Sequence, residues 1–543
     1  MGAAAAVGWG LRAYLRRRIK RLSDDAHWAR SARQIQTGTL RSLLQRAAAT
    51  EVGRERGFAC LAERPDDADL LAAYRDAVAP ADYEAWRPFM TRMREHAEPD
   101  VTWPGVVRDW AQTSGTTGGE KYIPVSREMM RSNYRAGLDI FAHAARWGLP
   151  LGGLFGGKIL FLGGCTDLTV NEHGVRTGDL SGLVTPMIRF PLDRVYLPGA
   201  EVALMSDWPK KIAAMSELCE RADVRGVSGM ASWSLALFED VLRRSRRRGG
   251  PAALRELWPN FRLFIHGGVR YNPFEPRVRE AWSGPGGDED VPCRLEVYPA
   301  SEGFIAVQDR RGDPGLRLHT DIGVCYEFLP LSEFPPDGDP TLASAKLCDE
   351  VEPGERYVVC MTTCAGLWRY VIGDVVEFNT IPPDGPPRLR IVGRHRHFVN
   401  AFGENLIVEE IERAVEAAQA ATGARAGEFT AAPVYPGEGG PGLELVCEFP
   451  GLGGAASGAA DARLPRFAEV FDQSLRALNV DYNTKRSGDF GMKPAAVTPV
   501  PVGSFHAWMA SRGKLGGQNK CPRCANHRDF ASGVVARAGA GVS

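Results

Sequence analysis

Residues 112–124, QTSGTTGGEKYIP, hold six small or hydroxylated side chains in an unbroken run from Thr113 to Gly118. Glycines allow the backbone to curl until consecutive N–H groups face one point, and hydroxyls add further donors, so such a run can bind phosphate. It is not the Walker loop, because no Gly-Lys-Ser/Thr triplet follows at the required spacing. An ordinary Ser/Thr/Gly turn is the commoner role of such a string. The segment alone therefore leaves a turn and a phosphate loop as alternatives.

Two carboxylates stand beside predicted strands. Glu302 follows the strand pattern that opens EVYPASEGFIAVQD (296–309), next to a serine and a glycine. A carboxylate in that position can hold a Mg²⁺ ion bound to phosphates, although an exposed loop glutamate is the commoner case. Asp374 follows Gly373 between two apolar strand patterns in GLWRYVIGDVVEF (366–378). It can accept hydrogen bonds from a ribose diol, although most Gly-Asp pairs are simple turns.

Two cations occupy places from which they could reach a bound nucleotide. Arg394 closes the strand pattern of RIVGRHRHFVNAFGENL (390–406), where an arginine at a hinge can reach across two domains. A solvated basic turn is the alternative, because further basic residues follow it. Lys520 lies in the glycine-rich stretch RGKLGGQNKCPRC (512–524), where a lysine can swing into a cleft and stabilise developing negative charge. An isolated surface lysine is the alternative.

The cysteines are expected to be free thiols and not metal ligands or disulfides. Cys521, Cys524 and His527 could form a metal or redox site, but structural zinc requires four ligands and no convincing fourth stands nearby. The 11 cysteines are odd in number and scattered from Cys60 onwards, which does not resemble a disulfide framework. We therefore expect a reducing, cytoplasmic setting.

Strand and helix patterns alternate between residues 150 and 400. Strands are predicted at 158–164, 262–268, 356–363 and 375–380, and helices at 38–50, 210–222, 233–248 and 405–421. This alternation predicts an α/β fold in which mixed sheets are layered with helices. PPDGPP (382–387) lies between two strand patterns and predicts a hairpin loop. The pattern changes past Val392, so we expect a large N-terminal domain (1–393) and a small, hinged C-terminal α/β domain (394–543).

Length and charge limit the possible classes of protein. A chain of 543 residues is too long for one core, so two or more domains are expected. Its apolar fraction of 44% is ordinary for a globular protein. Lys+Arg and Asp+Glu both total 66, and this zero net charge disfavours a dedicated nucleic-acid binder. No run of about 20 apolar residues predicts a transmembrane helix.

The N-terminal stretch MGAAAAVGWGLRAYLRRRIKRL places six basic residues after a short apolar run. A secretory signal has the reverse order, and N-myristoylation would require Ser or Thr where Ala6 stands. The spacing predicts an amphipathic helix with Leu11, Tyr14, Leu15 and Ile19 on one side. We expect that side to pack on the domain and the basic side to face water. Contact with a membrane surface and a transit peptide are the alternatives.

The order of the segments is more specific than any one of them. A Ser/Thr/Gly loop, a strand followed by Ser-Glu, a Gly-Asp between strands, a hinge Gly-Arg and a late loop lysine follow one another as in the adenylate-forming enzymes. Within that superfamily the chain resembles the GH3 acyl-acid amido synthetases, and it looks closer to their bacterial-type members than to the plant hormone enzymes. The similar segments span roughly residues 35–530 and include 100–126, 227–239, 257–274, 303–309, 362–374, 392–410 and 504–523.

Three departures from the family's pattern concern substrate choice more than catalysis. Gly119-Glu120 stand where the family has serine before the lysine, which leaves open whether Lys121 contacts phosphate. Trp368 stands where tyrosine is usual, near the implied acid pocket. Pro299-Ala300 replaces small residues before the Ser-Glu pair.

The resemblance implies a ligase that uses ATP and Mg²⁺ to activate a carboxylic acid as an acyl-adenylate and then conjugates it to an amino acid amine. It implies that Glu302 holds Mg²⁺ and that Glu302 and Lys520 are catalytic. The implied ATP contacts are Ser114, Gly115, Thr116, Thr117, Gly267, Gly268, Val269, Tyr298, Ser301, Asp374 and Arg394, with His266 to Val269 lining the adenine. The implied acid pocket contains Ser232, Trp233 and Trp368, which favours an aryl or hydrophobic acid. Plain core packing is the alternative for the two tryptophans.

Two other functions stay open beside this one. An adenylate-forming ligase that passes the acyl group to coenzyme A shares the core motifs, but the extended C-terminal signature at 504–523 argues against it. A non-catalytic relative that binds an acid or a nucleotide is the second, and the joint presence of Glu302, Asp374, Arg394 and Lys520 argues against it. We expect small-molecule acid and amino acid partners, no nucleic acid, no integral membrane segment and a monomer.

Overall fold

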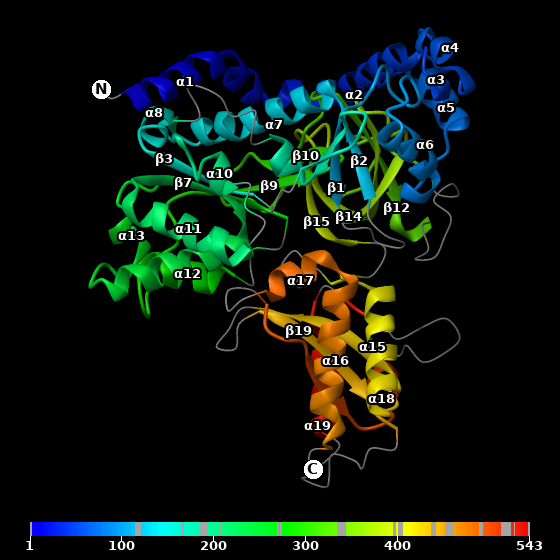
Figure 1. Ribbon diagram of the computed structural model, residues 1–543. Coiled ribbons are helices and arrows are strands. Elements are labelled where there is room, and N and C mark those ends of the chain that lie inside the picture. Colours follow the sequence, from blue (N-terminus) through cyan, green and yellow to red (C-terminus); the bar gives the residue numbers. More distant parts are fainter. Residues whose placement is uncertain are drawn as a thin grey trace.

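The computed structural model describes residues 3–113, 121–163, 168–184, 194–203, 205, 208–268, 271, 274–333, 344–394, 398–399, 406–435, 441–450, 461–487, 492–511, 523–525 and 527–540. These residues form a large N-terminal part with mixed α/β layers and a smaller C-terminal α/β part (Figure 1).

An 11-stranded sheet forms the centre of the N-terminal part. Its strands, in spatial order, are β12 (Val324–Pro330), β13 (Arg356–Thr363), β14 (Tyr370–Thr380), β15 (Arg388–Arg394), β11 (Leu316–Leu318), β10 (Gly303–Gln308), β9 (Arg294–Ala300), β8 (Leu263–Gly267), β7 (Val224–Met230), β3 (Lys158–Leu162) and β6 (Tyr196–Leu197). The strands from β6 to β9 run parallel, and those from β9 to β12 run antiparallel. The pairing in the sheet therefore changes from parallel to antiparallel at β9.

Helices cover both faces of the parallel half. The helices of this region are α7 (Arg127–Arg146), α8 (Leu151–Leu154), α9 (Leu180–Val184), α10 (Ala200–Ala203), α11 (Trp208–Arg221), α12 (Ala231–Arg247), α13 (Leu254–Leu257) and α14 (Glu275–Ser283). In Figure 1, α7 and α8 lie above β3 and β7, and α11 and α12 lie below them. The apolar residues between these layers form two separate buried clusters, one on each face of the sheet, as an α/β layer fold requires.

The antiparallel half packs against an N-terminal group of helices and a small second sheet. The helices are α2 (Asp25–Ala47), α3 (Glu51–Glu55), α4 (Phe58–Ala62), α5 (Asp67–Ala77) and α6 (Tyr83–Glu95), whereas α1 (Ala3–Leu22) packs on α7 and α8. The second sheet has the order β2 (Lys121–Val125), β1 (Asp109–Thr113), β5 (Arg176–Gly178) and β4 (Thr169–Val170). Apolar side chains from helices α2 to α6 and from both sheets share one buried cluster.

The C-terminal part has its own sheet, of strands β18 (Phe429–Val434), β19 (Gly442–Glu448) and β20 (Ala496–Val500). Its helices are α15 (Val408–Thr422), α16 (Arg463–Leu478), α17 (Val480–Arg486), α18 (Ser504–Ser511) and α19 (Asp529–Ala540), and a short β16 (Phe398–Val399) and β17 (Leu406–Ile407) pair precedes them. Figure 1 shows this part below the N-terminal part, with α17 at the end nearest to it.

Most predicted elements are confirmed, and the fold class with them. The predicted strands at 158–164, 262–268 and 356–363 are β3, β8 and β13, the predicted helices at 210–222, 233–248 and 405–421 are α11, α12 and α15, and the helix predicted at 38–50 belongs to the longer α2. The 382–387 segment joins two antiparallel neighbours, β14 and β15, as predicted. The prediction of two strands around Gly373-Asp374 is wrong, because β14 runs through both residues.

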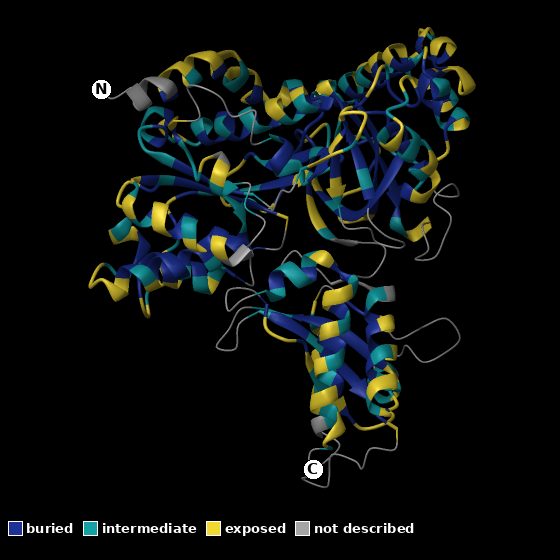
Figure 2. Ribbon diagram, in the orientation of Figure 1, coloured by how far each residue is buried: buried dark blue, intermediate teal, exposed yellow. Residues whose placement is uncertain are grey.

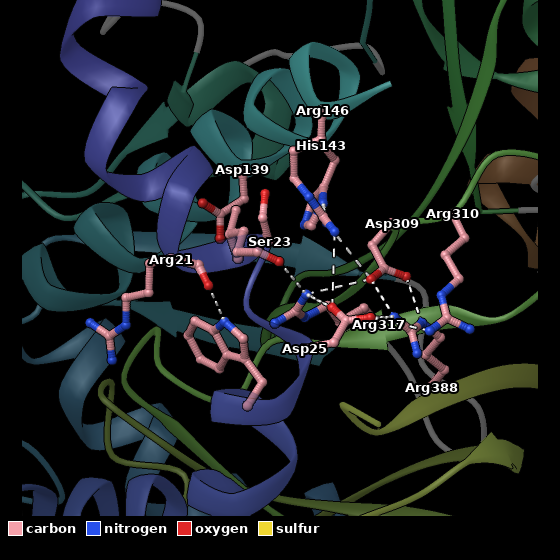
Figure 3. A network of polar contacts seen from close by, with 12 residues as sticks. Arg21, Ser23, Asp25, Asp139, His143, Arg146, Asp309, Arg310, Arg317 and Arg388 are labelled. Atoms are coloured by element: carbon pink, nitrogen blue, oxygen red, sulfur yellow. Dashed lines mark hydrogen bonds and ion pairs between the residues drawn. The ribbon is translucent and has the colours of Figure 1, made fainter. Parts of the chain in front are cut away.

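Buried ion pairs fasten the N-terminal helices to the sheet. Asp309 follows β10, and its carboxylate accepts two hydrogen bonds of 2.7 Å from Arg388 at the start of β15 (Figure 3). Asp25, the first residue of α2, lies 3.3 Å from the same guanidinium. Arg317 of β11 lies 3.4 Å from Asp309 and donates to the backbone of Leu22 at 3.0 Å. These contacts fix the end of α1 and the start of α2 against three strands.

Burial follows the layers, with the strands buried and the outer sides of the helices exposed (Figure 2). The nine cysteines among the described residues are free thiols. None of the described helices is long and apolar enough to span a bilayer.

Candidate active site

The carboxyl ends of three parallel strands lie side by side. Met230 at the end of β7 pairs with Gly267 at the end of β8, and Gly267 pairs with Val297 of β9. In α/β sheets, ligands bind outside the carboxyl ends of such strands, most often where the strand order or direction changes. The change of direction at β9 therefore marks the candidate site.

Gly267 and Gly268 are required by the backbone at this edge. A Cβ on Gly267 would stand 2.2 Å from the Val297 carbonyl oxygen, which no side chain could tolerate. Gly268 has a φ of +80°, and a Cβ there would lie 3.3 Å from the Met230 side chain. The two glycines thus allow Val297 of β9 and Met230 of β7 to lie close to the end of β8. Val269, which follows them, lies outside the described residues.

Two tyrosines bind the two predicted carboxylates. The Tyr298 hydroxyl of β9 donates to Asp374 of β14 at 2.5 Å, and the Tyr370 hydroxyl of β14 donates to Glu302 at 3.2 Å. Glu302 and Asp374 are each only 7% exposed. Half-buried Ser301 lies in the same turn as Glu302, between β9 and β10.

These contacts show that the large sheet bends back on itself. Three strands, β10, β11 and β15, separate β9 from β14 in the order of the sheet. A flat sheet would place strands four positions apart about 19 Å from each other, because neighbouring strands are about 4.8 Å apart. A direct hydrogen bond between Tyr298 and Asp374 is possible only across a strongly curved sheet. The curvature brings both carboxylates to one region.

Strand pairing also brings Arg394 to the same region. Arg394 is the last residue of β15, and it pairs directly with Asp374 of β14. Its side chain is outside what the structure describes. The predicted ribose carboxylate and the predicted hinge arginine are therefore opposite each other on neighbouring strands, 20 residues apart in the chain.

The strands β1 and β2 flank the predicted phosphate loop. Thr113 pairs with Lys121 at the ends of the two antiparallel strands. Ser114, Gly115, Thr116 and Thr117 stand between these two residues in the chain and lie outside the described residues, as does Lys520. The ammonium group of Lys121 lies 5.8 Å from the centre of the Tyr83 ring, and the Tyr83 hydroxyl accepts a 2.8 Å hydrogen bond from the Tyr122 amide. Helix α6 thereby fixes the start of β2.

Trp368 packs in the core of the N-terminal part. Its side chain is 0% exposed, and its ring centre lies 4.5 Å from that of Phe58 and 6.2 Å from that of Trp103. The indole N–H donates to the Thr102 carbonyl at 3.2 Å. The indole is therefore buried in the core, and the role of Trp368 beside the acid pocket stays a prediction.

Trp233 lies in the first turn of α12, just after the carboxyl end of β7. Ser232 precedes it in the same turn. The ammonium group of Lys485, a buried residue of α17, lies 4.4 Å from the centre of the Trp233 ring. The rings of Phe274 and Tyr435 make a second contact between the two parts, at 6.4 Å. The C-terminal part therefore touches the N-terminal part next to the predicted acid pocket.

The Lys485–Trp233 contact predicts energetic coupling between the two parts. A cation over an indole stabilises by about 0.5–2 kcal/mol. We expect a double-mutant cycle of Lys485→Met and Trp233→Leu, measured by denaturant unfolding, to give a coupling energy of about 1 kcal/mol. Lys493→Met, at an exposed position of the C-terminal part, is the matched control and should give no coupling with Trp233→Leu. Additive effects of the first pair would contradict the contact.

Sequence reasoning missed a polar group beneath the site. Glu296 of β9 lies on the same side of the strand as Tyr298, because side chains two residues apart share a face, and it pairs with His266 of β8. Burial raises the pKa of Glu296 to about 7 and lowers that of His266 to about 3, and Arg294 acts on both. The His266 ring stacks on Tyr271 with centres 4.6 Å apart. The alternating pattern RLEVY of a buried strand is the signal that could have revealed Glu296.

The raised pKa of Glu296 predicts a stability that falls as the pH rises. Its ordinary value is 4.5, so folding favours the protonated form, and the stabilisation is lost as the pH rises from 4.5 to about 7. We expect Glu296→Gln to unfold like the wild type near about pH 4 and to be more stable by about 2–3 kcal/mol near about pH 8. Urea unfolding at several pH values measures this, with Glu355→Gln at an exposed turn as the control. Parallel profiles for the wild type and Glu296→Gln would contradict the assignment.

Models of one family match three successive stretches of the chain. The GH3 family N-terminal domain matches residues 21–237, the GH3 family central domain residues 318–394 and the GH3 family C-terminal domain residues 409–529. The relatives include the "Probable indole-3-acetic acid-amido synthetase GH3.9" of Oryza sativa subsp. japonica, which is 27% identical over 55% of this chain and 67% of its own length. Two further plant relatives are matched over 52% and 45% of their length, so the similarity spans about half to two thirds of such proteins.

Two solved structures share the fold over nearly the whole chain. The GH3.15 acyl acid amido synthetase superposes with a TM-score of 0.56 at 19% identity, covering 95% of both chains. The 2-hydroxyisobutyryl-CoA ligase, in complex with 2-HIB-AMP and CoA, superposes with a TM-score of 0.54 at 16% identity, covering 95% of this chain and 94% of its own. At these identities the likeness concerns the fold.

Proposed function

Because the chain belongs to the GH3 family, we propose that it is an ATP-dependent acyl-acid amido synthetase. The enzyme activates a carboxylic acid as an acyl-adenylate and conjugates it to an amino acid amine. The named activities of the plant relatives support the amide product, since they are amido synthetases.

One observation supports the proposal most. Glu302, in the turn after β9, and Asp374, within β14, are both buried, and each accepts a hydrogen bond from a tyrosine hydroxyl. Burying two carboxylates costs free energy, because the charged groups lose contact with water. Such a cost is expected where the carboxylates serve a bound cation or a sugar hydroxyl.

The roles of the residues follow from this arrangement. Asp374 binds the ribose hydroxyls, and Arg394, opposite it on β15, contacts ribose or phosphate. Tyr298, Gly267, Gly268 and Val269 surround the adenine, for which the two glycines leave the backbone accessible. The Ser114–Thr117 loop, together with Ser301, holds the phosphates through N–H groups and hydroxyls. Lys520 completes the site from the C-terminal domain.

Glu302 suits a magnesium ion. The ion prefers carboxylate oxygens and keeps several waters and phosphate oxygens as its other ligands, so one protein carboxylate suffices. The Tyr370 hydroxyl donates to Glu302 and helps to hold the carboxylate in place. Mg²⁺ bound there would neutralise part of the triphosphate charge.

The reaction has two steps. In the first, a carboxylate oxygen of the acid attacks the α-phosphorus of ATP, the bond to the β-phosphate breaks, and pyrophosphate leaves with its electron pair. In the second, the amine of the amino acid attacks the acyl carbon, loses a proton, and AMP leaves. Phosphoryl transfer depends chiefly on positioning and charge stabilisation, which the loop, Glu302 and Lys520 supply.

The acid is proposed to bind beside α12. Ser232 and Trp233 lie at its start, next to the Met230 end of β7 and to Lys485 of the C-terminal part. An aromatic wall favours an aryl or hydrophobic acid.

The proposed domains are 1–393 and 394–543, and the smaller one closes differently for each step. We further propose that the enzyme is a monomer and that it acts in the cytoplasm.

Trapping of the intermediate and product analysis test this function. Acyl-adenylate formed from ATP and an acid reacts with hydroxylamine to give a hydroxamate, which reports the first step alone. The second step is then run with a mixture of amino acids or with coenzyme A. We expect amides from amino acids and no thioester. Thioester formation without amide would assign the chain to the acyl–coenzyme A ligases instead.

A further inference from the structure

Helix α1 presents a cationic outward face that the proposed reaction does not use. Arg12, Arg16, Arg17, Lys20 and Arg21 are exposed along it, and we call these five residues the α1 face. The helix contains no acidic residue. The charge of this face therefore has no neutralising partner on the helix itself.

Exposed aromatic rings flank the α1 face. Trp9 is 60% exposed and Tyr14 is 71% exposed. The expectation that Tyr14 packs with Leu11, Leu15 and Ile19 is thus wrong for the tyrosine, while Leu15 is buried and the other two are partly buried. Among the described residues, three large aromatic side chains are strongly exposed, and two of them belong to α1.

The α1 face is held rigidly. Arg18, which points inward, donates to Asp139 of α7 at 2.8 Å and to Asp321 at 2.6 Å. The Trp28 indole donates to the Arg21 carbonyl at 2.8 Å, and Figure 3 shows this bond beside the buried ion pairs. The five cations therefore belong to a fixed helix and are presented together.

The position of α1 suits a flat partner. A helix of 20 residues is about 30 Å long. Figure 1 shows α1 along the outer side of the N-terminal part, on the side away from the C-terminal part. A surface that covers α1 would leave the C-terminal part free to move.

We propose that the α1 face binds the surface of an anionic lipid membrane. Anionic headgroups attract basic clusters held close to them, and tryptophan and tyrosine rings favour the headgroup level of a bilayer. The apolar side of α1 is already packed on the protein, so the helix lies on the surface and does not insert. Attachment is then electrostatic and reversible.

A second basic run in the chain shows what distinguishes the α1 face. Arg246, Arg247 and Arg248 are exposed at the end of α12. Acidic neighbours accompany them, since Arg248 lies 3.1 Å from Glu220. No exposed tryptophan or tyrosine has been found among the described residues of α12. This run therefore supplies a control in which three charges can be removed, as many as in a triple variant of the α1 face.

Co-sedimentation with vesicles tests the proposal. The full chain is mixed with vesicles of phosphatidylcholine alone or with about 30% phosphatidylserine. We expect binding only to the anionic vesicles, and less binding at higher salt. Each basic residue near such a surface raises the partition constant about fivefold. The partition constant of the triple variant Arg16→Gln, Arg17→Gln, Lys20→Gln should therefore be about 100-fold lower, because the three decreases of about fivefold multiply.

The controls separate charge from position and binding from folding. The triple variant Arg246→Gln, Arg247→Gln, Arg248→Gln carries the same charge change and should bind vesicles like the wild type. Both triple variants change exposed side chains, so both should unfold at the wild-type temperature. Equal loss in the two variants would overturn the proposal, as would a lack of binding to anionic vesicles. Binding of the wild type to duplex DNA or RNA but not to vesicles would assign the α1 face to nucleic acid instead.

Discussion

Glu302→Gln is expected to lower the rate of acid-dependent ATP–pyrophosphate exchange by about 10³-fold, because it removes the charge proposed to hold Mg²⁺ at the triphosphate. Glutamine keeps the size of the side chain and can still accept the hydrogen bond from Tyr370. The concentration of Mg²⁺ that gives half-maximal exchange should rise about tenfold or more. A residue with only a structural role would not change this requirement.

Tyr370→Phe is the matched control for Glu302. It removes the hydroxyl and keeps the ring and the charge of Glu302, so we expect a loss of only about tenfold, as for one hydrogen bond. Thermal unfolding of both variants shows whether they fold. A folded Glu302→Gln enzyme with an unchanged rate and an unchanged Mg²⁺ requirement would refute the metal role of Glu302.

Lys520→Ala is expected to lower acid-dependent pyrophosphate release by about 10³-fold while ATP still binds, because the lysine is proposed to stabilise charge that develops in the first step. The second step should be affected far less. Supplying a preformed acyl-adenylate together with the amine should therefore yield amide at close to the wild-type rate. A difference between the two half-reactions is the signature of a lysine carried by a mobile domain.

The control for Lys520 comes from the same glycine-rich stretch. Lys514→Ala removes a lysine six positions earlier and should leave both half-reactions unchanged. Direct measurement of ATP binding, for example by calorimetry, distinguishes a loss of chemistry from a loss of affinity. Unchanged adenylation in Lys520→Ala would remove Lys520 from the mechanism.

Periodic patterns predicted the elements that carry the site. The helices α12 and α15 and the strand β8 follow directly from apolar spacing, since that spacing reflects which face is buried. The strand after Gly373 was mistaken for a separate element because a Gly-Asp pair usually marks a turn. Gly373 has a φ of +93°, and the neighbouring pairing shifts register, so β14 absorbs the glycine without ending.

Contacts between distant segments could not be predicted in the same way. Tyr370 of β14 and Glu302, in the turn between β9 and β10, stand 68 residues apart, and other strands separate β14 from β9 and β10 in the sheet. Only the curvature of the sheet brings them together, and no local pattern encodes that curvature. The meeting of Lys485 with Trp233 depends on how the C-terminal part rests on α12. For Trp368, the resemblance implied a place near the acid pocket, and the packing shows a ring that is buried in the core.

The most direct test of the proposed activity is ATP–pyrophosphate exchange with a broad panel of carboxylic acids. The exchange requires reversible formation of an acyl-adenylate, so it reports the first step without knowledge of the amine. We predict that at least one aryl or hydrophobic acid stimulates exchange, and that Glu302→Gln lowers the stimulated rate by about 10³-fold. A folded enzyme that binds ATP or an acid but exchanges with none of the panel would contradict the account and leave a non-catalytic binding protein.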